Sequence, residues 1–154
     1  MDDRSRARKT IEKIRYITIA TSDRKGRPWN TPIYSAYGNG YTFYWVTSPR
    51  SRHSLNIKQN KRVAIVVYDS TVPEGAGFGV YIDARSGMVT DRAEQEKALR
   101  LLYGRKNKNP RPLSDFTGSS PRRIYKAVPR RFWVNSVAFV RGHPVDIRKE
   151  IRLA

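Results

Sequence analysis

Apolar and polar residues follow one another along this chain with the period of β-strands. Val80, Ile82 and Ala84 alternate with polar neighbours, which predicts a half-buried strand over residues 80–89. Residues 62–69 are almost entirely apolar, so we expect a central strand that is covered on both faces. Runs of β-branched and aromatic residues bounded by polar clusters predict further strands at 16–21, 29–37, 41–47, 123–128, 131–140 and 145–151.

Helical segments are few and short. Residues 5–15 have a thin apolar stripe among Arg and Lys, which predicts an amphipathic helix packed on an edge of the sheet. Residues 48–60 are polar and compatible with a helix, and Leu55 and Ile57 are available for burial. The helices are too few for a regular alternation with strands, so the chain is not expected to form a parallel sheet.

Capping and turn residues mark where several elements begin and end. Asp91 is followed three positions later by Glu94, a spacing typical of a helix start, and the helix is expected to run to about residue 105. Gly and Asn at 38–40 predict a tight hairpin turn, because both residues tolerate positive φ. Pro28 and Pro32 mark the second strand as an edge strand or a bulged one.

Together these elements predict a mainly β fold with peripheral α-helices. Six to seven mostly antiparallel strands that meander early in the chain indicate a small β-barrel or a sandwich, and we favour the barrel. With 154 residues and no internal repeat, residues 1–154 are expected to form a single domain.

The charge of the chain is unusual and narrows the choice of partners. Lys and Arg number 31 against 13 Asp and Glu, a net charge of +18. Such a field attracts nucleic acid, acidic membranes or phosphorylated small molecules, but a generally basic surface without a specific partner has the same composition. No apolar run is long enough to span a membrane, and a cytoplasmic location is expected. With no Cys and two His, the chain is not expected to hold a transition metal.

One segment combines groups that suit a phosphate. The strand 43–47 leads into Ser and Thr hydroxyls, Arg50, Arg52 and the first turn of the expected helix. Free N–H groups at a helix N-terminus and fixed guanidinium groups both bind phosphate well. From these residues alone, an ordinary helix cap with solvated arginines is an equally good interpretation.

At this point the chain resembles the pyridoxamine 5'-phosphate oxidase-like family, the FMN-binding split β-barrels. The resemblance rests on four segments in the right order: residues 26–32, 43–47, 51–53 and 60–64. It is strongest over 17–89, resumes at 131–135 and covers about two thirds of the chain. The family implies a homodimer of split barrels with FMN in two clefts between the subunits.

The resemblance assigns the phosphate end of the cofactor site to five residues. Ser51, Arg52 and His53 stand where the family has a Ser-Arg-Lys phosphate clamp, with His53 in place of the lysine. Val46 and Thr47 stand where the family lines the ribityl chain and the phosphate. Because His replaces Lys, part of the positive charge of the clamp would depend on pH.

Four further residues are assigned to the flavin ring by the same resemblance. Thr31, Pro32 and Ile33 would run along the edge of the isoalloxazine, where main-chain groups of the family reach the pyrimidine ring. Trp133 stands where the family has a tryptophan that approaches the flavin from the partner chain. A large core aromatic is the other interpretation of Trp133.

The chain also departs from the family pattern. The family has a lysine at the end of the flavin strand, but this chain has no lysine at the corresponding position, which falls near Ala36. No segment of the chain resembles the one that holds pyridoxal phosphate in the true oxidase. Residues 141–143 resemble a C-terminal Arg-x-His but are interpreted as a turn with solvated charge. The glycine-rich segment 75–79 precedes a strand, so it is expected to be a loop at the rim of the cleft, with Glu74 as a possible substrate contact.

The expected function is therefore that of an FMN-dependent oxidoreductase that transfers hydride through flavin N5 to or from an unknown small substrate. No catalytic acid–base pair stands out. One alternative is a reductase on the same fold that uses the deazaflavin F420, whose acidic tail suits Arg and Lys. A non-catalytic basic barrel that binds nucleic acid is a second alternative. Most Tyr and Trp fall inside expected strands, so nucleic acid is not the expected partner. Without a long apolar run, a membrane is not expected as a partner either.

Overall fold

The computed structural model describes residues 1–153 and has a mainly β fold, as predicted. None of its helices is long and apolar enough to cross a membrane. The helices are α1 (Asp3–Lys13), α2 (Arg52–Gln59) and α3 (Arg92–Gly104), with short 3-10 turns η1 (Asn39–Tyr41) and η2 (Leu113–Phe116). The strands are β1 (Tyr16–Ser22), β2 (Pro28–Tyr34), β3 (Ala36–Tyr37), β4 (Phe43–Thr47), β5 (Arg62–Tyr68), β6 (Gly79–Met88), β7 (Arg123–Val140) and β8 (His143–Ile151).

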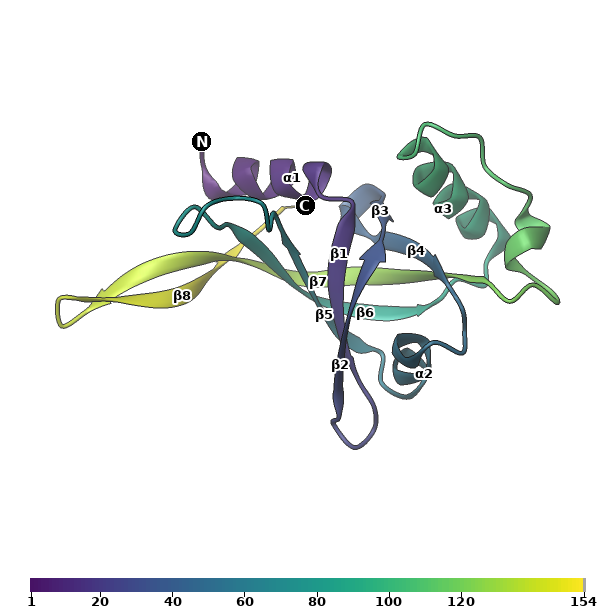
Figure 1. Cartoon of the computed structure of the whole chain (residues 1–154), viewed down its shortest axis with the longest axis horizontal. Helices are drawn as coiled ribbons and strands as arrows, with labels where there is room; N and C mark the ends of the chain where they lie inside the picture. Colours follow the sequence, from purple (N-terminus) through teal and green to yellow (C-terminus); the bar gives the residue numbers. More distant parts are fainter. Residues whose placement is uncertain (154) are drawn as a thin grey trace.

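All strands pair antiparallel in one strongly curled sheet (Figure 1). The pairing order is β2-β1-β5-β6-β7-β4-β3, with β8 added to β7. The two ends of this path, β2 and β3, are separated in the sequence by Ser35 alone, so the sheet must curl until its ends meet. No ladder joins them within the described residues, and the barrel is therefore split.

Two apolar clusters lie on the two sides of this sheet. The larger cluster fills the inside of the barrel with Trp45, Phe43 and the inward residues of β1, β5 and β6, and α1 closes it with Ile11. The smaller cluster lies between the outside of β4 and α3, around Leu102 and Phe116. The predicted cap of α3 is confirmed, because an Asp91 carboxylate oxygen accepts a hydrogen bond from the Glu94 amide at 2.8 Å.

The guanidinium of Arg105, just after α3, joins three parts of the body. It donates hydrogen bonds to the carbonyls of Ser35, Ile11, Glu12 and Ile14 at 2.7–3.1 Å. Three of these carbonyls end α1, where backbone acceptors lack helical partners. Burial lowers the pKa of Arg105, and the side chain remains a cation at any physiological pH.

Four sequence expectations about the elements are wrong in detail. β5 alternates between buried and exposed residues, because no other layer of this chain covers its outer face. Leu55 is exposed, and α2 buries Ile57 alone of the two. The strand expected at 29–37 breaks at Ser35 where the sheet turns. The strands expected at 123–128 and 131–140 are one strand, because a bulge between Pro129 and Arg131 absorbs the proline without ending the ladder.

The far end of β7 and most of β8 leave the body as a two-stranded arm, defined here as residues 136–147 (Figure 1). Its turn is made by Arg141 and Gly142, both with positive φ. Val137, Phe139, Val140, Val145 and Ile147 of the arm are exposed large apolar side chains. The expectation of a charged turn at 141–143 is confirmed.

Candidate functional site

The structure brings three of the predicted phosphate residues together at the N-terminus of α2. The Nε2 atom of His53 lies 2.9 Å from Thr47 Oγ1 and 3.0 Å from Ser51 Oγ, and the two hydroxyls are 3.4 Å apart. Thr47 ends β4, and Ser51 caps α2 by accepting from the Ser54 amide. We call Thr47, Ser51 and His53 with the first turn of α2 the cradle.

Buried polar contacts fix the position of α2 and hence of the cradle. The Asn56 side-chain amide donates to Thr21 Oγ1 on β1 at 3.0 Å, and Thr21 donates to the Trp29 carbonyl on β2. Asn60 donates to Ser22 at 2.9 Å, and Ile57 packs into the barrel core. The helix is therefore held against β1 at both its buried face and its C-terminus.

The charge of the cradle comes from the backbone and Arg52 more than from His53. Burial lowers the pKa of His53, so its imidazole is neutral at pH 7. The amides of Arg52 and His53 donate no hydrogen bond within the described chain, as expected for the first turn of a helix. These amides and the helix dipole favour an anion at this point.

Arg52 extends from the cradle over β2. Its guanidinium carbon lies 4.3 Å from the centre of the Trp29 ring, and both side chains are exposed. Trp29, Thr31 and Ile33 alternate with Pro32 along β2, so the first three share the face that is turned toward α2 and the core.

The predicted ring-edge residues of β2 have three different environments. Thr31 is half-buried, and its hydroxyl is inaccessible to solvent and has no hydrogen-bond partner. Ile33 is buried in the barrel core, so only its backbone could meet a ligand. Pro32 is exposed on the opposite face of β2. The side chains of these three residues therefore do not form one surface.

Trp133 does not lie in the cradle of its own chain. Trp133 pairs with Tyr81 on the neighbouring strand, and the same row of paired residues continues across the sheet through Val66 and Thr18 to Pro32. All five residues therefore share the outer face of the sheet. The Arg131 guanidinium lies 4.8 Å from the Trp133 ring centre. Trp133 is half-buried and is therefore not the core aromatic of the other interpretation.

A cavity of about 440 Å³ that no sequence motif had indicated adjoins the cradle. Val46, Thr47 and Ser48 form one wall, and the end of α3 and the following loop supply the others, including Leu102, Phe116, Lys106 and Arg122. We call it the chamber. Its lining holds two cations and no carboxylate. In the sequence, the apolar residues Leu113 and Phe116 lie within a loop rich in Pro and Gly, and they indicate that this segment packs against the body.

A second hollow of about 490 Å³ shares Ser48 and Pro121 with the chamber. Arg50, Arg123 and the hydroxyls of Ser119 and Ser120 line it, again without a carboxylate. The chamber and this basic hollow are therefore neighbours beside the loop that leads into α2.

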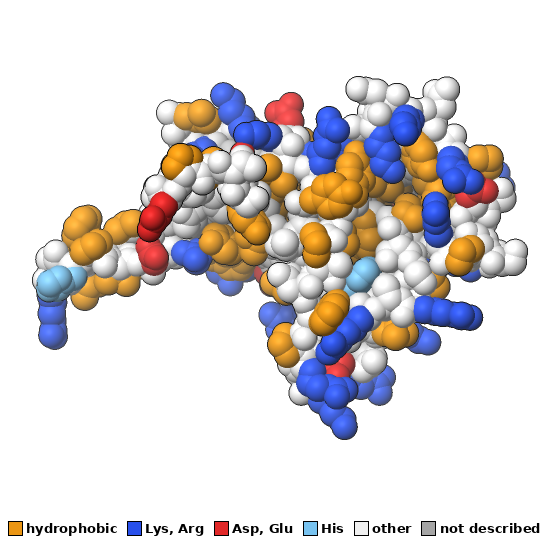
Figure 2. Space-filling view, in the orientation of Figure 1, with side chains coloured by type: hydrophobic (Ala, Val, Ile, Leu, Met, Phe, Trp, Pro, Cys, Tyr) orange, Lys and Arg blue, Asp and Glu red, His pale blue; other side chains and the backbone are white. Residues whose placement is uncertain are grey.

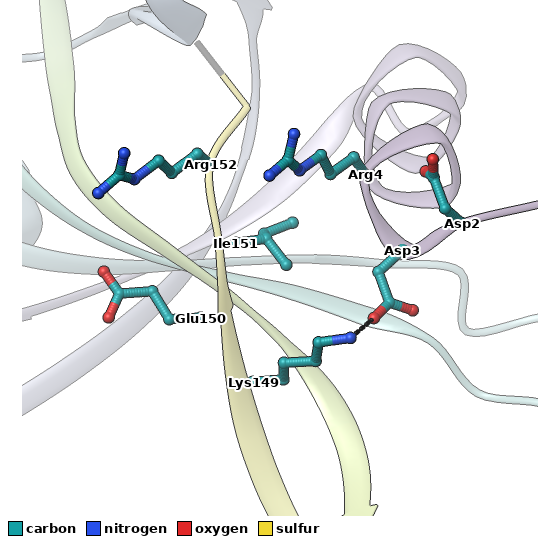
Figure 3. Close-up of a pocket in the computed structure, with 7 residues that line it drawn as sticks. All are labelled: Asp2, Asp3, Arg4, Lys149, Glu150, Ile151 and Arg152. Atoms are coloured by element: carbon teal, nitrogen blue, oxygen red, sulfur yellow. Dashed lines mark hydrogen bonds and ion pairs between the residues drawn. The ribbon is translucent and has the colours of Figure 1, made fainter.

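Another hollow, of about 610 Å³, lies elsewhere, between the start of α1 and the end of β8 (Figure 3). Four of its charged groups have partners: Asp3 pairs with Lys149 at 2.8 Å, Glu150 pairs with Arg131, and Asp2 caps α1. Ile151 is the one apolar residue among those that line it, none of them is Ser, Thr, Cys or His, and it is not the candidate site.

The loop 75–79 does not border the cradle. Arg6 of α1 lies over the Phe78 ring at 4.2 Å and donates to the Ala76 carbonyl at 3.5 Å. This loop is held beside α1 and leads into β6, which agrees with the sequence argument against a Rossmann motif. The rim role expected for the loop and for Glu74 finds no support in this position.

The residues present fit an FMN phosphate. The cradle offers two free amides and two hydroxyls, Arg52 adds a cation, and the unpartnered Thr31 hydroxyl stands on the face of β2 that is turned toward α2. A buried hydroxyl without a partner is costly, so a ligand that bonds to it is a physical reason for its presence.

Solved structures of similar fold come from several bacteria. A candidate 5-nitroimidazole antibiotic resistance protein from Bacteroides thetaiotaomicron has a TM-score of 0.70 at 15% identity, with 87% of this chain and 84% of that chain covered. An FAD-binding protein from Mesorhizobium loti has a TM-score of 0.64 at 18% identity, with 87% and 94% covered. HutZ, the heme storage protein of Vibrio cholerae, has a TM-score of 0.60 at 17% identity, with 84% and 92% covered. At these identities the likeness shows the fold alone.

Sequence comparison decides the family. No curated protein is similar enough to the chain to count as a relative. The family model described as pyridoxamine 5'-phosphate oxidase matches residues 4–135, which includes the cradle, β2 and Trp133. The chain therefore belongs to the pyridoxamine 5'-phosphate oxidase family.

Proposed function

We propose that the chain binds FMN at the cradle and acts as a flavin-dependent oxidoreductase on a small substrate. The observation that carries the proposal is the cluster of Thr47, Ser51 and His53 beside two unpaired amides, in a chain of this family. In the family of split barrels the bound flavin supplies hydride transfer through N5, so the protein has to bind, orient and shield it.

The residues of the cradle have distinct tasks in this proposal. The amides of Arg52 and His53 and the hydroxyl of Ser51 bind phosphate oxygens, and Arg52 neutralises part of the charge. Neutral His53 holds both hydroxyls in place through Nε2.

The chamber is the proposed place of the substrate. It adjoins Thr47, its walls are largely apolar, and Lys106 and Arg122 are its charged groups. The Lys106 ammonium lies 4.9 Å from the Tyr34 ring centre and 4.8 Å from that of Tyr103. These walls suit a small molecule with an apolar ring and a negative group.

A second copy of the chain belongs to the same proposal. Trp133 is on the outer face of its own sheet, away from its own cradle, so it can approach a flavin only in another subunit. The expected homodimer would then shield the ring from water.

The test is a titration of the purified protein with FMN, followed by flavin fluorescence and absorbance. Arg52→Ala removes a charge-assisted contact on an exposed side chain and is expected to weaken binding about tenfold. Ser51→Ala removes the cap and a phosphate contact and should weaken binding at least as much. Lys58→Ala, at the other end of α2, is the matched control and should bind as the wild type does. Wild-type protein that takes up no flavin would overturn the proposal.

The basic hollow favours one second candidate, F420. An acidic tail that leaves the cradle past Ser48 would meet Arg50 and Arg123 and no carboxylate. A side-by-side titration with FMN and F420 separates the two cofactors. Arg50→Ala should weaken F420 binding and leave FMN binding unchanged. Tighter binding of FMN by the wild type would reject the F420 candidate.

Because HutZ is a heme storage protein, hemin belongs in the same titration. His53 Nε2 already has two hydroxyl partners within 3.0 Å, so it is not free to bind iron without breaking both contacts. Hemin added to the wild type is therefore not expected to give the absorbance spectrum of a heme bound by His53. The variant His53→Gln should give the same hemin spectrum as the wild type.

A further inference from the structure

The polar side chains of the cradle share very few hydrogen atoms. His53 is 7% exposed, and its Nε2 atom lies within 3.0 Å of both Thr47 Oγ1 and Ser51 Oγ. The Ser51 hydroxyl also donates to the Ser54 hydroxyl at 2.8 Å and accepts from the Ser54 amide at 3.4 Å. Each hydroxyl has one hydrogen to donate, so the position of the imidazole proton decides where these hydrogens point.

Without a proton on Nε2, the cradle has no hydroxyl hydrogen to offer a ligand. In this tautomer Nε2 is an acceptor, and it takes the hydrogen of the Thr47 hydroxyl. The hydrogen of Ser51 is directed at Ser54. A dianionic phosphate has acceptor oxygens only, so it would meet the lone pairs of both hydroxyls. This tautomer therefore opposes the anion that the backbone amides of the cradle attract.

With a proton on Nε2, the same side chains become a set of donors. The imidazole then donates to the hydroxyl oxygens, and the hydrogen of Thr47 is released for an anion. The amides of Arg52 and His53 point to the same place. The imidazolium ion has this Nε2–H as well, and its charge is opposite to that of the anion. An anion in the cradle therefore favours both protonated forms of Nε2.

No acidic group competes with an anion for the imidazole in the part of the cradle that the structure describes. The charged side chains of its own segment are Arg50 and Arg52, and Arg52 lies over Trp29. Helix α2 packs on β1, β2 and β6 and begins beside the end of β4. Alternation along these strands places their titratable side chains on the face that is turned away from α2. They are Tyr16, Tyr34, Tyr44, Tyr81, Asp83 and Arg85.

We propose that His53 is a positioning residue that couples phosphate binding in the cradle to the protonation of its own imidazole. The proposal rests on the proposed function for the identity of the anion, the phosphate of FMN. At high pH, a neutral imidazole with its proton on Nε2 directs the hydroxyls toward the phosphate. As the pH falls, the bound anion draws a second proton from the solvent onto Nδ1, and the cradle gains a positive charge.

The coupling has a definite sign. Burial lowers the pKa of His53 in the free protein, and a bound anion raises it again. Affinity for the anion should therefore increase as the pH falls from the higher pKa of the complex to the lower pKa of the free protein. Above the first value and below the second, the affinity no longer changes through His53.

The first test compares the binding of FMN and riboflavin at pH 8 and pH 6.5. The wild type should bind FMN about fivefold more tightly at pH 6.5, and riboflavin, which has no phosphate, equally well at both. His53→Gln has an amide N–H near the position of Nε2 but does not titrate, so it should bind FMN with no such pH dependence. This variant also corrects for the FMN phosphate, which takes up a proton at about pH 6. A pH dependence that persists in His53→Gln, or that riboflavin shares, would overturn the proposal.

Thr47→Val tests the hydroxyl that the Nε2 proton releases. The substitution keeps the branched shape of the side chain and removes one charge-assisted hydrogen bond to the phosphate. FMN binding should weaken about tenfold, and riboflavin binding should stay unchanged. Equal affinity of Thr47→Val and the wild type for FMN would show that the Thr47 hydrogen does not reach the anion.

Nuclear magnetic resonance of the imidazole nitrogens tests the proton position without a flavin. The chain has two histidines, so His143→Gln assigns both sets of signals. Sulfate is the probe, because its charge does not change near neutral pH. It should move the Nε2 signal of His53 to that of a protonated nitrogen and raise the titration midpoint by about one pH unit.

The histidine of the arm is the internal control for this measurement. Lys and Arg side chains are spread over the face of the molecule seen in Figure 2, so sulfate is also attracted without any specific site. His143 is exposed and should report that general effect alone. Equal responses of His53 and His143 to sulfate would overturn the proposal.

The two proposals fail separately. FMN that binds while the Nε2 signal of His53 stays that of a bare nitrogen would contradict the coupling and leave flavin binding intact. Protein that takes up no flavin but shows the response of His53 to sulfate would contradict the proposed function. The coupling of this imidazole to an anion would then still hold.

Discussion

The body half of β7, residues 123–135, and its arm half, residues 136–140, have opposite surroundings. In the body half, Phe132 is 7% exposed and Val134 is fully buried. Phe139 in the arm half is 74% exposed and Val137 is 54% exposed. Most of the body half is paired on both sides, with β6 and either β4 or β8, whereas the arm half has β8 alone.

This contrast shows that apolar residues in a strand have two different roles, one inside the core of the chain and one on an exposed surface. In the body, period-2 alternation is explained by the core of the chain itself. In the arm, both faces carry apolar side chains and the chain supplies nothing to cover them. The arm is therefore interpreted as a contact surface, and a residue of the body can be compared with the arm or with its base.

The largest expected effect separates the two phenylalanines of β7. Phe132→Ala leaves a cavity in the barrel core and should lower the free energy of unfolding by about 3–5 kcal/mol. Phe139→Ala should change the stability of the monomer by less than about 0.5 kcal/mol. Urea unfolding at two protein concentrations measures both values and separates monomer stability from dimer dissociation. Equal losses in the monomer would mean that the arm packs on its own body.

Two arginines give the next comparison. Arg105→Ala leaves four carbonyls without their donor and should cost roughly 2–3 kcal/mol in the free energy of unfolding. Arg148→Ala at the base of the arm removes an exposed cation–π contact and should cost about 0.5 kcal/mol or less. Thermal unfolding of both variants provides the check, and a larger loss for Arg148→Ala would reverse the ranking of body and arm.

Alkaline pH should destabilise the body through Tyr44. Burial, followed by the Glu94 carboxylate that accepts its hydroxyl hydrogen, raises the pKa of Tyr44 to about 12. The unfolded tyrosine loses its proton near pH 10, so stability is full below that pH and falls above it, by roughly 2 kcal/mol at pH 12. Tyr44→Phe should remove this part of the pH dependence. The arm contains no tyrosine and contributes nothing to it. An unchanged slope in Tyr44→Phe would contradict the assignment.

The smallest effect concerns the two histidines, one in each region. Burial lowers the pKa of His53, so protonation is easier in the unfolded chain and stability should decline as the pH falls below about 6.5. His53→Gln should flatten this decline. His143→Gln in the exposed turn of the arm is the matched control. Unfolding midpoints from pH 5 to pH 8 measure the difference, and a decline that survives in His53→Gln would place its cause elsewhere.

Much of the fold follows from the sequence alone because its signals are local. Period-2 alternation located β6, a nearly continuous apolar run located β5, and runs of β-branched and aromatic residues located β1, β4 and β8. Side-chain chemistry located the cap of α3 and the turn before β4. The hydroxyls and arginines that follow β4 located the cradle, since a strand, a turn and a helix start are contiguous in the chain. The order of motifs was enough to identify the family.

Tertiary structure decided whatever depends on residues far apart in the sequence. The curl of the sheet results from pairing that leaves β2 and β3 at its two ends, and the chamber forms because α3 and its loop fold back on β4. Burial of His53 decides that it is neutral, and register decides that Trp133 faces outward. The hydrophobic pattern shows which side chains should be covered, but it does not show which part of the structure covers them. The sequence of β5 therefore predicted a strand with two covered faces, whereas the folded chain covers one face of this strand.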